Sequence, residues 1–191
     1  VHMGLQYPER CYSLCVAGCG YGAEKKYEEY FKGVSLEVAK NFEEKGASEF
    51  AKIYSLGASR VQFQNKNPRG WQEFAQRLAE HSSKGSALTM RGVQARRPSL
   101  YDLEEELKSM SVPTLIVNGD EDDHCLQVGL YLKKVIPASG LLVLPKTGHT
   151  LNLEDPGVFN RSISDFLTLV SNERWLPRDP IANPEQVMRT D

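Results

Sequence analysis

Two short loops hold the side chains of this sequence that are best suited to acid–base chemistry. Residues 119–123 read Gly-Asp-Glu-Asp-Asp and place four carboxylates directly after an apolar run, and residues 148–150 place His149 directly after another. A carboxylate that hydrogen-bonds to an imidazole fixes its tautomer and stabilises the imidazolium that forms when the ring takes a proton. The two loops therefore predict a carboxylate–histidine pair, and at this point any carboxylate of the acidic loop could be the partner.

The two loops follow the most strand-like segments of the chain. Residues 112–119 form a continuous apolar and β-branched run that ends in glycine, and residues 140–145 form a second apolar run. The lack of alternation predicts strands that are buried on both faces, as in a parallel sheet. Adjacent parallel strands lie about 4.8 Å apart, and ligands bind beyond their carboxyl ends. Loops that leave the same ends can therefore bring a carboxylate to His149.

The rest of the chain predicts an α/β protein with a helical insertion. A helix end is expected over residues 1–10, and a third buried strand over residues 11–17. The glycine-rich residues 18–22 that follow are typical of a tight turn near a cleft. Residues 23–108 have helical periodicity in four or five stretches and no convincing strand. This pattern indicates a parallel sheet interrupted by helices.

Two more helices are predicted towards the end of the chain. Residues 126–135 follow the acidic loop, and residues 156–170 carry an apolar stripe at helical spacing. Residues 172–191 contain three prolines and no periodicity. This last segment is expected to form a loosely packed tail.

The acidic and histidine loops resemble the end of α/β-hydrolase-fold enzymes. Those proteins carry a strand that ends Gly-x-x-Asp and, about 25–30 residues later, Gly-His followed by an acidic residue and a proline that opens the last helix. Here Gly119-x-x-Asp122 matches the acid position, and the separation 149 − 122 = 27 matches the distance to His149. Residues 5–18 look like the helix end and strand after the nucleophile, and residues 23–108 look like the helical cap.

The resemblance implies roles for two residues and leaves a third position empty. His149 would be the general base and later the general acid, and Asp122 would orient it, with Asp120 and Asp123 as alternatives. The family's nucleophile elbow, Gly-x-Ser-x-Gly, is absent, because residues 57–61 lack the second glycine and a preceding strand. The family pattern places the nucleophile about six residues before Val1. We therefore expect it outside the chain, and residues 1–191 alone to be inactive.

Substrate-binding residues are harder to predict. The candidates are Tyr21, Trp71, Phe74 and Thr150. The aromatic residues among 23–108 could line a cavity under the cap, together with Phe63 and Met90, or could equally form the cap's own core. The pair Arg96-Arg97 could meet an anionic substrate, although a solvated linker is the interpretation we favour.

The cysteines and His124 do not predict a metal site. Cys11, Cys15 and Cys19 are spaced by four residues, which on a strand separates neighbouring cysteines by about 13 Å, too far to share one ion. They are predicted to be buried small hydrophobic residues. His124 adjoins the acidic loop, but one histidine beside adjacent aspartates has poor ligand geometry. We predict no metal and no cofactor.

Composition and charge exclude several classes of partner. The 191 residues carry a formal net charge of −2, which gives no electrostatic reason to expect nucleic acid or an anionic membrane as partner. No apolar run approaches the roughly 20 residues that a membrane-spanning helix needs. No signal peptide is visible, so a cytoplasmic location with reduced cysteines is expected. The sequence does not predict an oligomeric state.

Together these observations predict a partial α/β-hydrolase core with three parallel strands. Residues 1–22 and 109–172 are expected to form the core, residues 23–108 the cap, and residues 173–191 a C-terminal tail. The expected function is hydrolysis of a small ester, lactone or related substrate by a nucleophile–His–Asp triad. The alternative is a non-catalytic protein of the same fold that binds a small ligand or a partner.

Overall fold

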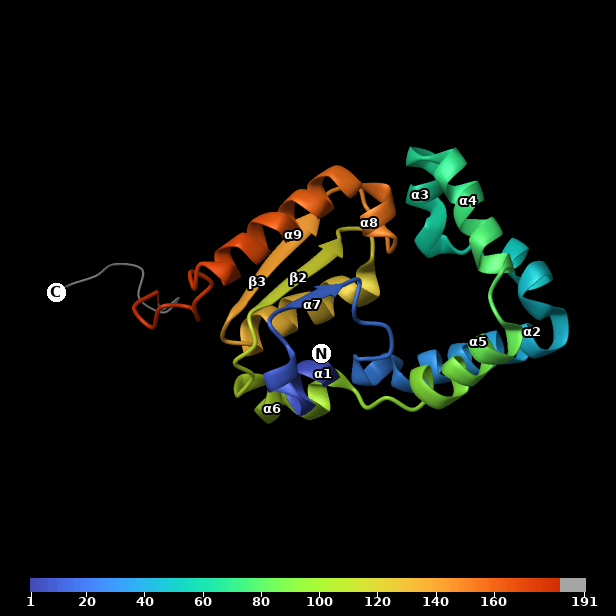
Figure 1. Cartoon of the computed structure of the whole chain (residues 1–191). Helices are drawn as coiled ribbons and strands as arrows, with labels where there is room; N and C mark the ends of the chain where they lie inside the picture. Colours follow the sequence, from blue (N-terminus) through green and yellow to red (C-terminus); the bar gives the residue numbers. More distant parts are fainter. Residues whose placement is uncertain (183–191) are drawn as a thin grey trace.

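The structure is a computed structural model that describes residues 1–182, and its centre is a three-stranded parallel sheet (Figure 1). The strands β1 (Leu14–Ala17), β2 (Thr114–Gly119) and β3 (Ser139–Leu144) lie in that order. Val117 of β2 pairs with Ala17 on one side and Leu142 on the other. The three predicted strands and their parallel arrangement are confirmed, and their carboxyl ends meet at one edge of the sheet.

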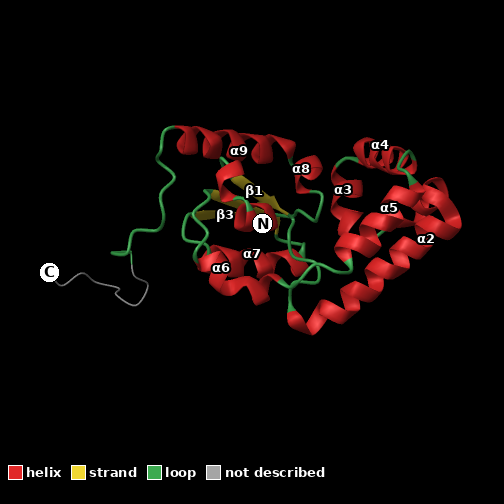
Figure 2. Cartoon of the chain, turned by 60° about the horizontal axis from the view of Figure 1, so that its bottom comes forward, coloured by secondary structure: helices red, strands yellow, loops and turns green. Residues whose placement is uncertain are grey.

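Helices cover both faces of the sheet (Figures 1 and 2). One face packs against α1 (His2–Gln6), α6 (Glu104–Lys108) and α7 (Asp123–Val135), and the other packs against α8 (Leu151–Glu154) and α9 (Pro156–Ser171). The sequence predicted α7 and α9 within a few residues of these bounds.

The central strand β2 supplies side chains to the cores on both faces. Ile116 belongs to the apolar cluster that includes Val128 of α7, whereas Val117 belongs to the cluster that includes Phe166 of α9. All six residues of β2 are buried. The uninterrupted apolar run that predicted this strand therefore reflects burial on both faces.

Residues 23–108, which we call the helical insertion, leave the core after β1 and return before β2. The insertion contains α2 (Glu28–Tyr54, kinked at Gly46), α3 (Val61–Lys66), α4 (Pro68–Ala79), α5 (Ser83–Thr89) and α6. Short 3-10 or π turns cover Lys25–Tyr27, Ala58–Arg60, Met90–Gln94 and Leu100–Leu103. The described residues of the insertion include no strand, as predicted.

Most of the insertion forms a separate body beyond the carboxyl ends of the strands (Figure 1). It has an apolar core of its own, made by Ala39, Phe42, Ala47, Phe50, Ala51, Leu78 and Ala87. This core holds α2, α4 and α5 together. The short helix α6 instead packs against the sheet-bound cluster through Leu107.

Two expectations about packing were wrong. Cys15 is exposed, and Cys11 and Cys19 are only half-buried, because β1 is an outer strand of the sheet that the structure describes. Trp175, expected in a loose tail, packs edge-on against Phe166 and donates a hydrogen bond of 3.0 Å to the carbonyl of Ala138. Residues 183–191 of the predicted tail lie outside the described residues.

Among residues 1–182, no helix combines the length and the apolar character that crossing a bilayer requires.

Candidate active site

The acidic loop and the histidine loop are tied together at the carboxyl ends of β2 and β3. The backbone N–H of Thr147 donates to Asp120 Oδ1 at 3.1 Å, and the N–H of Glu121 donates to the Thr147 carbonyl at 3.0 Å. The approach is so close that a Cβ atom on Gly119 would lie 2.1 Å from the Thr147 carbonyl oxygen. Only glycine fits at residue 119, and the two loops are fixed relative to each other.

This arrangement brings His149 onto Asp122. His149 Nδ1 lies 2.8 Å from Asp122 Oδ2, and the side chain of Asp122 is 1% exposed against 27% for His149. Neither alternative carboxylate makes this contact: Asp120 accepts from the histidine loop's backbone, and Asp123 begins α7. The geometric pairing that the sequence predicts is therefore present, with Asp122 as the partner.

The charge state of Asp122 determines which imidazole nitrogen holds a proton. Burial opposes ionisation of this carboxyl group, but the hydrogen bond and charge of His149 outweigh it, so the pKa of Asp122 is lower than its ordinary value. The carboxylate is ionised at neutral pH and accepts a hydrogen bond from Nδ1. In a neutral ring Nε2 is then unprotonated, as a general base requires.

Glu154 holds the histidine loop from the other side. Its buried carboxylate accepts hydrogen bonds from the N–H of Gly148 at 2.7 Å and from the N–H and hydroxyl of Thr150 at 3.0 and 2.8 Å. These donors flank His149 in the chain. Sequence reasoning gave Glu154 no role, because its partners are mostly backbone groups of a loop whose path is not encoded in a residue pattern.

The glycine-rich turn after β1 packs against the imidazole. Gly18 has φ +54°, and a Cβ atom there would lie 3.2 Å from His149 Nδ1. The ring of Tyr21 meets the imidazole edge-on, with centroids 5.0 Å apart. Burial, followed by the negative charge of Asp122, raises the pKa of Tyr21, so its hydroxyl keeps its proton and remains a donor.

Cys125 lies beside the Asp122–His149 pair. Its Sγ is 3.9 Å from His149 Nδ1, and among the described residues these three side chains alone bring possible metal-ligand atoms within 4.8 Å of one another. Burial, followed by the charge of Asp122, raises the pKa of Cys125, which keeps the thiol protonated. Because the thiolate is the form that binds metal or attacks a substrate, this favours an apolar packing role. The absence of a metal stays a prediction.

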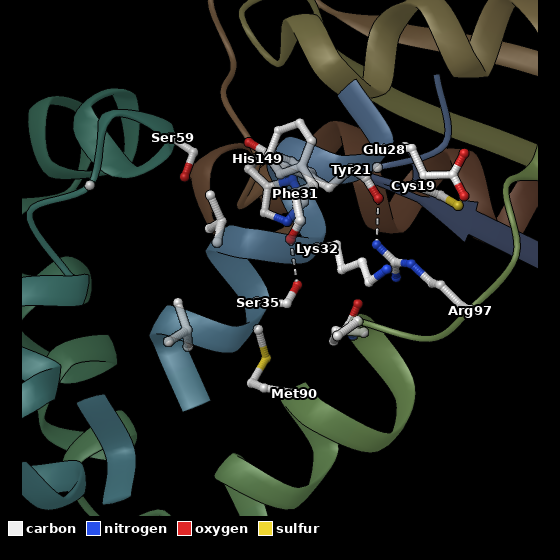
Figure 3. A pocket seen from close by; sticks show the side chains of 18 of the residues that line it. Cys19, Tyr21, Glu28, Phe31, Lys32, Ser35, Ser59, Met90, Arg97 and His149 are labelled. Atoms are coloured by element: carbon white, nitrogen blue, oxygen red, sulfur yellow. Dashed lines mark hydrogen bonds between the residues drawn. The ribbon is translucent and has the colours of Figure 1, made fainter. Parts of the chain in front are cut away.

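A cavity of about 980 Å³ lies between these loops and the helical insertion (Figure 3). The core contributes His149 and the turn from Gly18 to Gly22 to its wall. The insertion contributes apolar side chains from α2 and the turn after α5, among them Phe31, Val34, Val38 and Met90. His149 thus lies where the loops of the core meet the part of the cavity wall that the insertion supplies.

The structure places only some of the predicted substrate-binding residues at this cavity. Tyr21 lines it, as does Met90. Trp71 does not: its indole donates to the Ser55 carbonyl at 2.8 Å inside the insertion. Phe74 packs edge-on against Phe63, with centroids 6.1 Å apart. Neither residue is on the cavity wall: of the two positions that the sequence left open, both pack within the insertion.

Thr150 does not lie on the cavity wall either. It is buried, and its hydroxyl is bound to Glu154. Sequence reasoning instead missed the turn of Ser59 and Arg60, which lines the cavity from the insertion. The Ser59 carbonyl accepts a hydrogen bond of 3.4 Å from the backbone N–H of His149, so this turn touches the histidine loop directly.

The sheet and the insertion define the fold class of this chain. It has part of the α/β-hydrolase fold, and solved α/β-hydrolases superpose on most of its length. The structure of MenH from S. aureus aligns with a TM-score of 0.76 at 23% identity, covering 84% of this chain and 60% of that protein. A thermophilic esterase from Thermogutta terrifontis aligns with a TM-score of 0.71 at 24% identity, covering 86% of this chain and 58% of the esterase.

Among curated proteins, this chain is similar to a putative 2-succinyl-6-hydroxy-2,4-cyclohexadiene-1-carboxylate synthase of Bacillus subtilis. The two are 34% identical over 74 residues, which is 39% of this chain and 26% of the relative. No protein-family model matches the chain. The chain thus spans about a quarter of this relative and about 60% of the solved structures.

Proposed function

We propose that the protein is a hydrolase of a small ester, lactone or related substrate, and that His149 and Asp122 are two members of its catalytic triad. The observation that carries this proposal is the 2.8 Å contact between His149 and a buried, ionised Asp122 at the wall of a large cavity. The fold is one in which solved neighbours include an esterase. A small molecule is the proposed partner, no cofactor is needed, and a cytoplasmic location remains our prediction.

In the proposed reaction, His149 accepts and then donates a proton in each of two half-reactions. Nε2 takes the proton from a hydroxyl or thiol nucleophile as that group attacks the substrate carbonyl, and the Asp122 carboxylate stabilises the imidazolium. The imidazolium then gives the proton to the leaving oxygen, which leaves an acyl-enzyme. Water, activated by the same nitrogen, releases the acid and regenerates the nucleophile. The nucleophile is proposed to lie outside residues 1–191, and the helical insertion to act as the cap.

A second candidate is a non-catalytic ligand-binding protein of the same fold. One observation favours it: no hydroxyl or thiol of residues 1–182 forms a hydrogen bond with Nε2 of His149. The side-chain contacts of the imidazole with Asp122 and Cys125 are both made by Nδ1. The cavity and the tied loops would then serve binding alone.

The test compares His149→Ala with His81→Ala in the protein expressed from its complete reading frame. His81 is exposed at the end of α4, so its replacement controls for loss of a histidine as such. With p-nitrophenyl butyrate as substrate, we expect kcat/KM to fall by roughly 10³-fold or more in His149→Ala and to stay unchanged in His81→Ala. A wild-type protein without esterase or lactonase activity would support the ligand-binding alternative. A His149→Ala variant with full activity would instead overturn the role of His149 in catalysis.

A further inference from the structure

The cavity contains a buried arginine that the proposed chemistry does not use. Arg60 ends the 3-10 turn Ala58–Arg60, lines the cavity, and is only 7% exposed. Guanidinium groups are always charged in proteins, and buried charges are almost always paired. A buried arginine therefore calls for an identified counter-charge.

Residues 1–182 do not supply that counter-charge. None of the ion pairs among them includes Arg60. Its Nη1 donates to Ser59 Oγ at 3.1 Å and to the Ser59 carbonyl at 3.5 Å. Its Nη2 has no hydrogen bond to the described residues, and its Nε is buried without a partner. The fork of donors that suits a carboxylate is thus largely unfilled.

Two aromatic rings hold the guanidinium in place. Its central carbon lies 5.5 Å from the ring centroids of both Tyr54 and Phe74. Such contacts stabilise a desolvated cation and fix the plane of the fork. The rings do not accept hydrogen bonds from the N–H groups at the edge of the guanidinium. The contacts therefore orient Arg60 but do not neutralise its charge.

The other charges on the cavity wall do not compensate for Arg60. The three acidic residues of the wall are already paired: Glu28 and Asp102 with Lys25, and Glu29 with Lys32. Arg96 and Arg97 also line the cavity, and among the described residues neither has a carboxylate partner; Arg97 donates to the carbonyl of Tyr21 (Figure 3). The uncompensated charge of the wall is positive.

We propose that the substrate carries a free carboxylate and that Arg60 binds it. The Ser59 carbonyl, one residue away, accepts the His149 N–H, so the arginine is anchored to the histidine loop. A carboxylate held by Arg60 would bring the rest of the substrate under the apolar wall of α2 and beside the imidazole. The reaction part of this inference rests on the proposed hydrolase function, whereas the binding part does not.

Binding is tested with a pair of isosteric probes, 4-phenylbutyrate and its neutral amide, by isothermal titration calorimetry on the protein from its complete reading frame. We expect the carboxylate to bind at least about tenfold more tightly than the amide, since hydrogen bonds to an ionised acceptor are roughly twice as strong as those between neutral groups. Arg60→Met should abolish this preference. The control Arg69→Met, which removes an exposed arginine paired with Glu73, should keep it.

Thermal unfolding separates binding from a structural role. Removing an unpaired buried charge in favour of methionine should leave the melting temperature of Arg60→Met unchanged or raise it. A melting temperature clearly below that of wild type would overturn the proposal, because it would mean that Arg60 stabilises the fold. If Arg60→Met does not fold at all, Arg60→Lys decides: a carboxylate preference at least about tenfold weaker supports the proposal, and an unchanged preference overturns it.

The two proposals fail separately. Calorimetry involves no bond cleavage, so a protein that binds 4-phenylbutyrate through Arg60 but cleaves no ester or lactone overturns only the hydrolase function. An active enzyme that does not prefer the carboxylate probe overturns only the carboxylate site. In an active enzyme, kcat/KM for mono-p-nitrophenyl glutarate relative to p-nitrophenyl butyrate should fall at least about tenfold in Arg60→Met.

Discussion

At the scale of single residues, the charge of Asp122 fixes the proton on Nδ1 of His149. Asparagine has nearly the same shape but can present an N–H to Nδ1, which leaves the ring in the wrong tautomer. For Asp122→Asn we therefore expect kcat to fall by about 10⁴-fold with little change in KM. Steady-state kinetics on a neutral aryl ester measures this, with Asp123→Asn on the exposed first turn of α7 as the control. Equal losses in the two variants would argue against the pairing.

The same carboxylate predicts a pH dependence of stability. Because the pKa of Asp122 is lower in the folded protein than its ordinary value of 3.8, its ionised form stabilises the fold at all pH values above 3.8, and this contribution is lost as the pH falls through the lower, folded value. The unfolding free energy of wild type minus that of Asp122→Asn should therefore decrease between pH 5 and pH 3. Urea unfolding at each pH measures the difference, and a constant difference would contradict the prediction.

At the scale of elements, the histidine loop depends on Glu154 of α8. In Glu154→Ala the N–H of Gly148 and the N–H and hydroxyl of Thr150 lose their acceptor. We expect the unfolding free energy to fall by about 1–3 kcal/mol and kcat to fall more than KM changes, since the imidazole is no longer held. Chemical denaturation and steady-state kinetics check this beside Glu44→Ala, an exposed glutamate of α2. Loss of stability with unchanged kcat would restrict Glu154 to a structural role.

The contact between the two loops predicts a large effect for one added methyl group. In Gly119→Ala the new Cβ would meet the backbone oxygens of Thr147 and Gly148, at 2.1 and 2.4 Å, and backbone cannot give way as a side-chain end can. The loops must separate, which breaks the Asp122–His149 contact. We expect a destabilisation of about 1–3 kcal/mol and loss of activity. The matched change Gly33→Ala on α2 meets nothing within 4 Å and should be neutral or stabilising.

Sequence patterns predicted the core elements far better than the cavity. The positions of Asp122 and His149 follow from strand order, because each residue lies in the loop that follows a strand and parallel strands end at the same edge. The cavity wall depends instead on how the helices of the insertion pack. Trp71 and Phe74 are as apolar as true lining residues, yet they face neighbouring helices. From the sequence, Arg60 is indistinguishable from an ordinary surface arginine, and its burial becomes visible only in the packed structure.

At the scale of the whole molecule, the sheet has an outer strand, β1, with a free edge among the described residues, and Cys15 on it is exposed. The chain also covers only 58–60% of the two solved structures compared above. We expect residues 1–191, expressed alone, to show no esterase turnover, because no hydroxyl or thiol of residues 1–182 forms a hydrogen bond with Nε2 of His149. A fluorogenic ester assay measures this against His149→Ala of the same chain. Turnover that is lost in His149→Ala and in Ser59→Ala would place the nucleophile on the cavity wall instead.

Within the helical insertion, the chain at residue 23 and the chain at residue 99 meet. The hydroxyl of Ser99 donates to the carbonyl of Ala23, and Arg97 bonds to the neighbouring Tyr21 carbonyl, so residues 24–98 leave the core and return to it at one point. A segment closed on itself in this way can be exchanged as a cassette: joining residue 23 to residue 99 through a short linker, or through the insertion of another protein, would not cut the sheet. Arg60 would leave with the cassette, whereas Asp122 and His149 would stay. Evolution and protein engineering could therefore change what enters the cavity without rebuilding the groups that act on it.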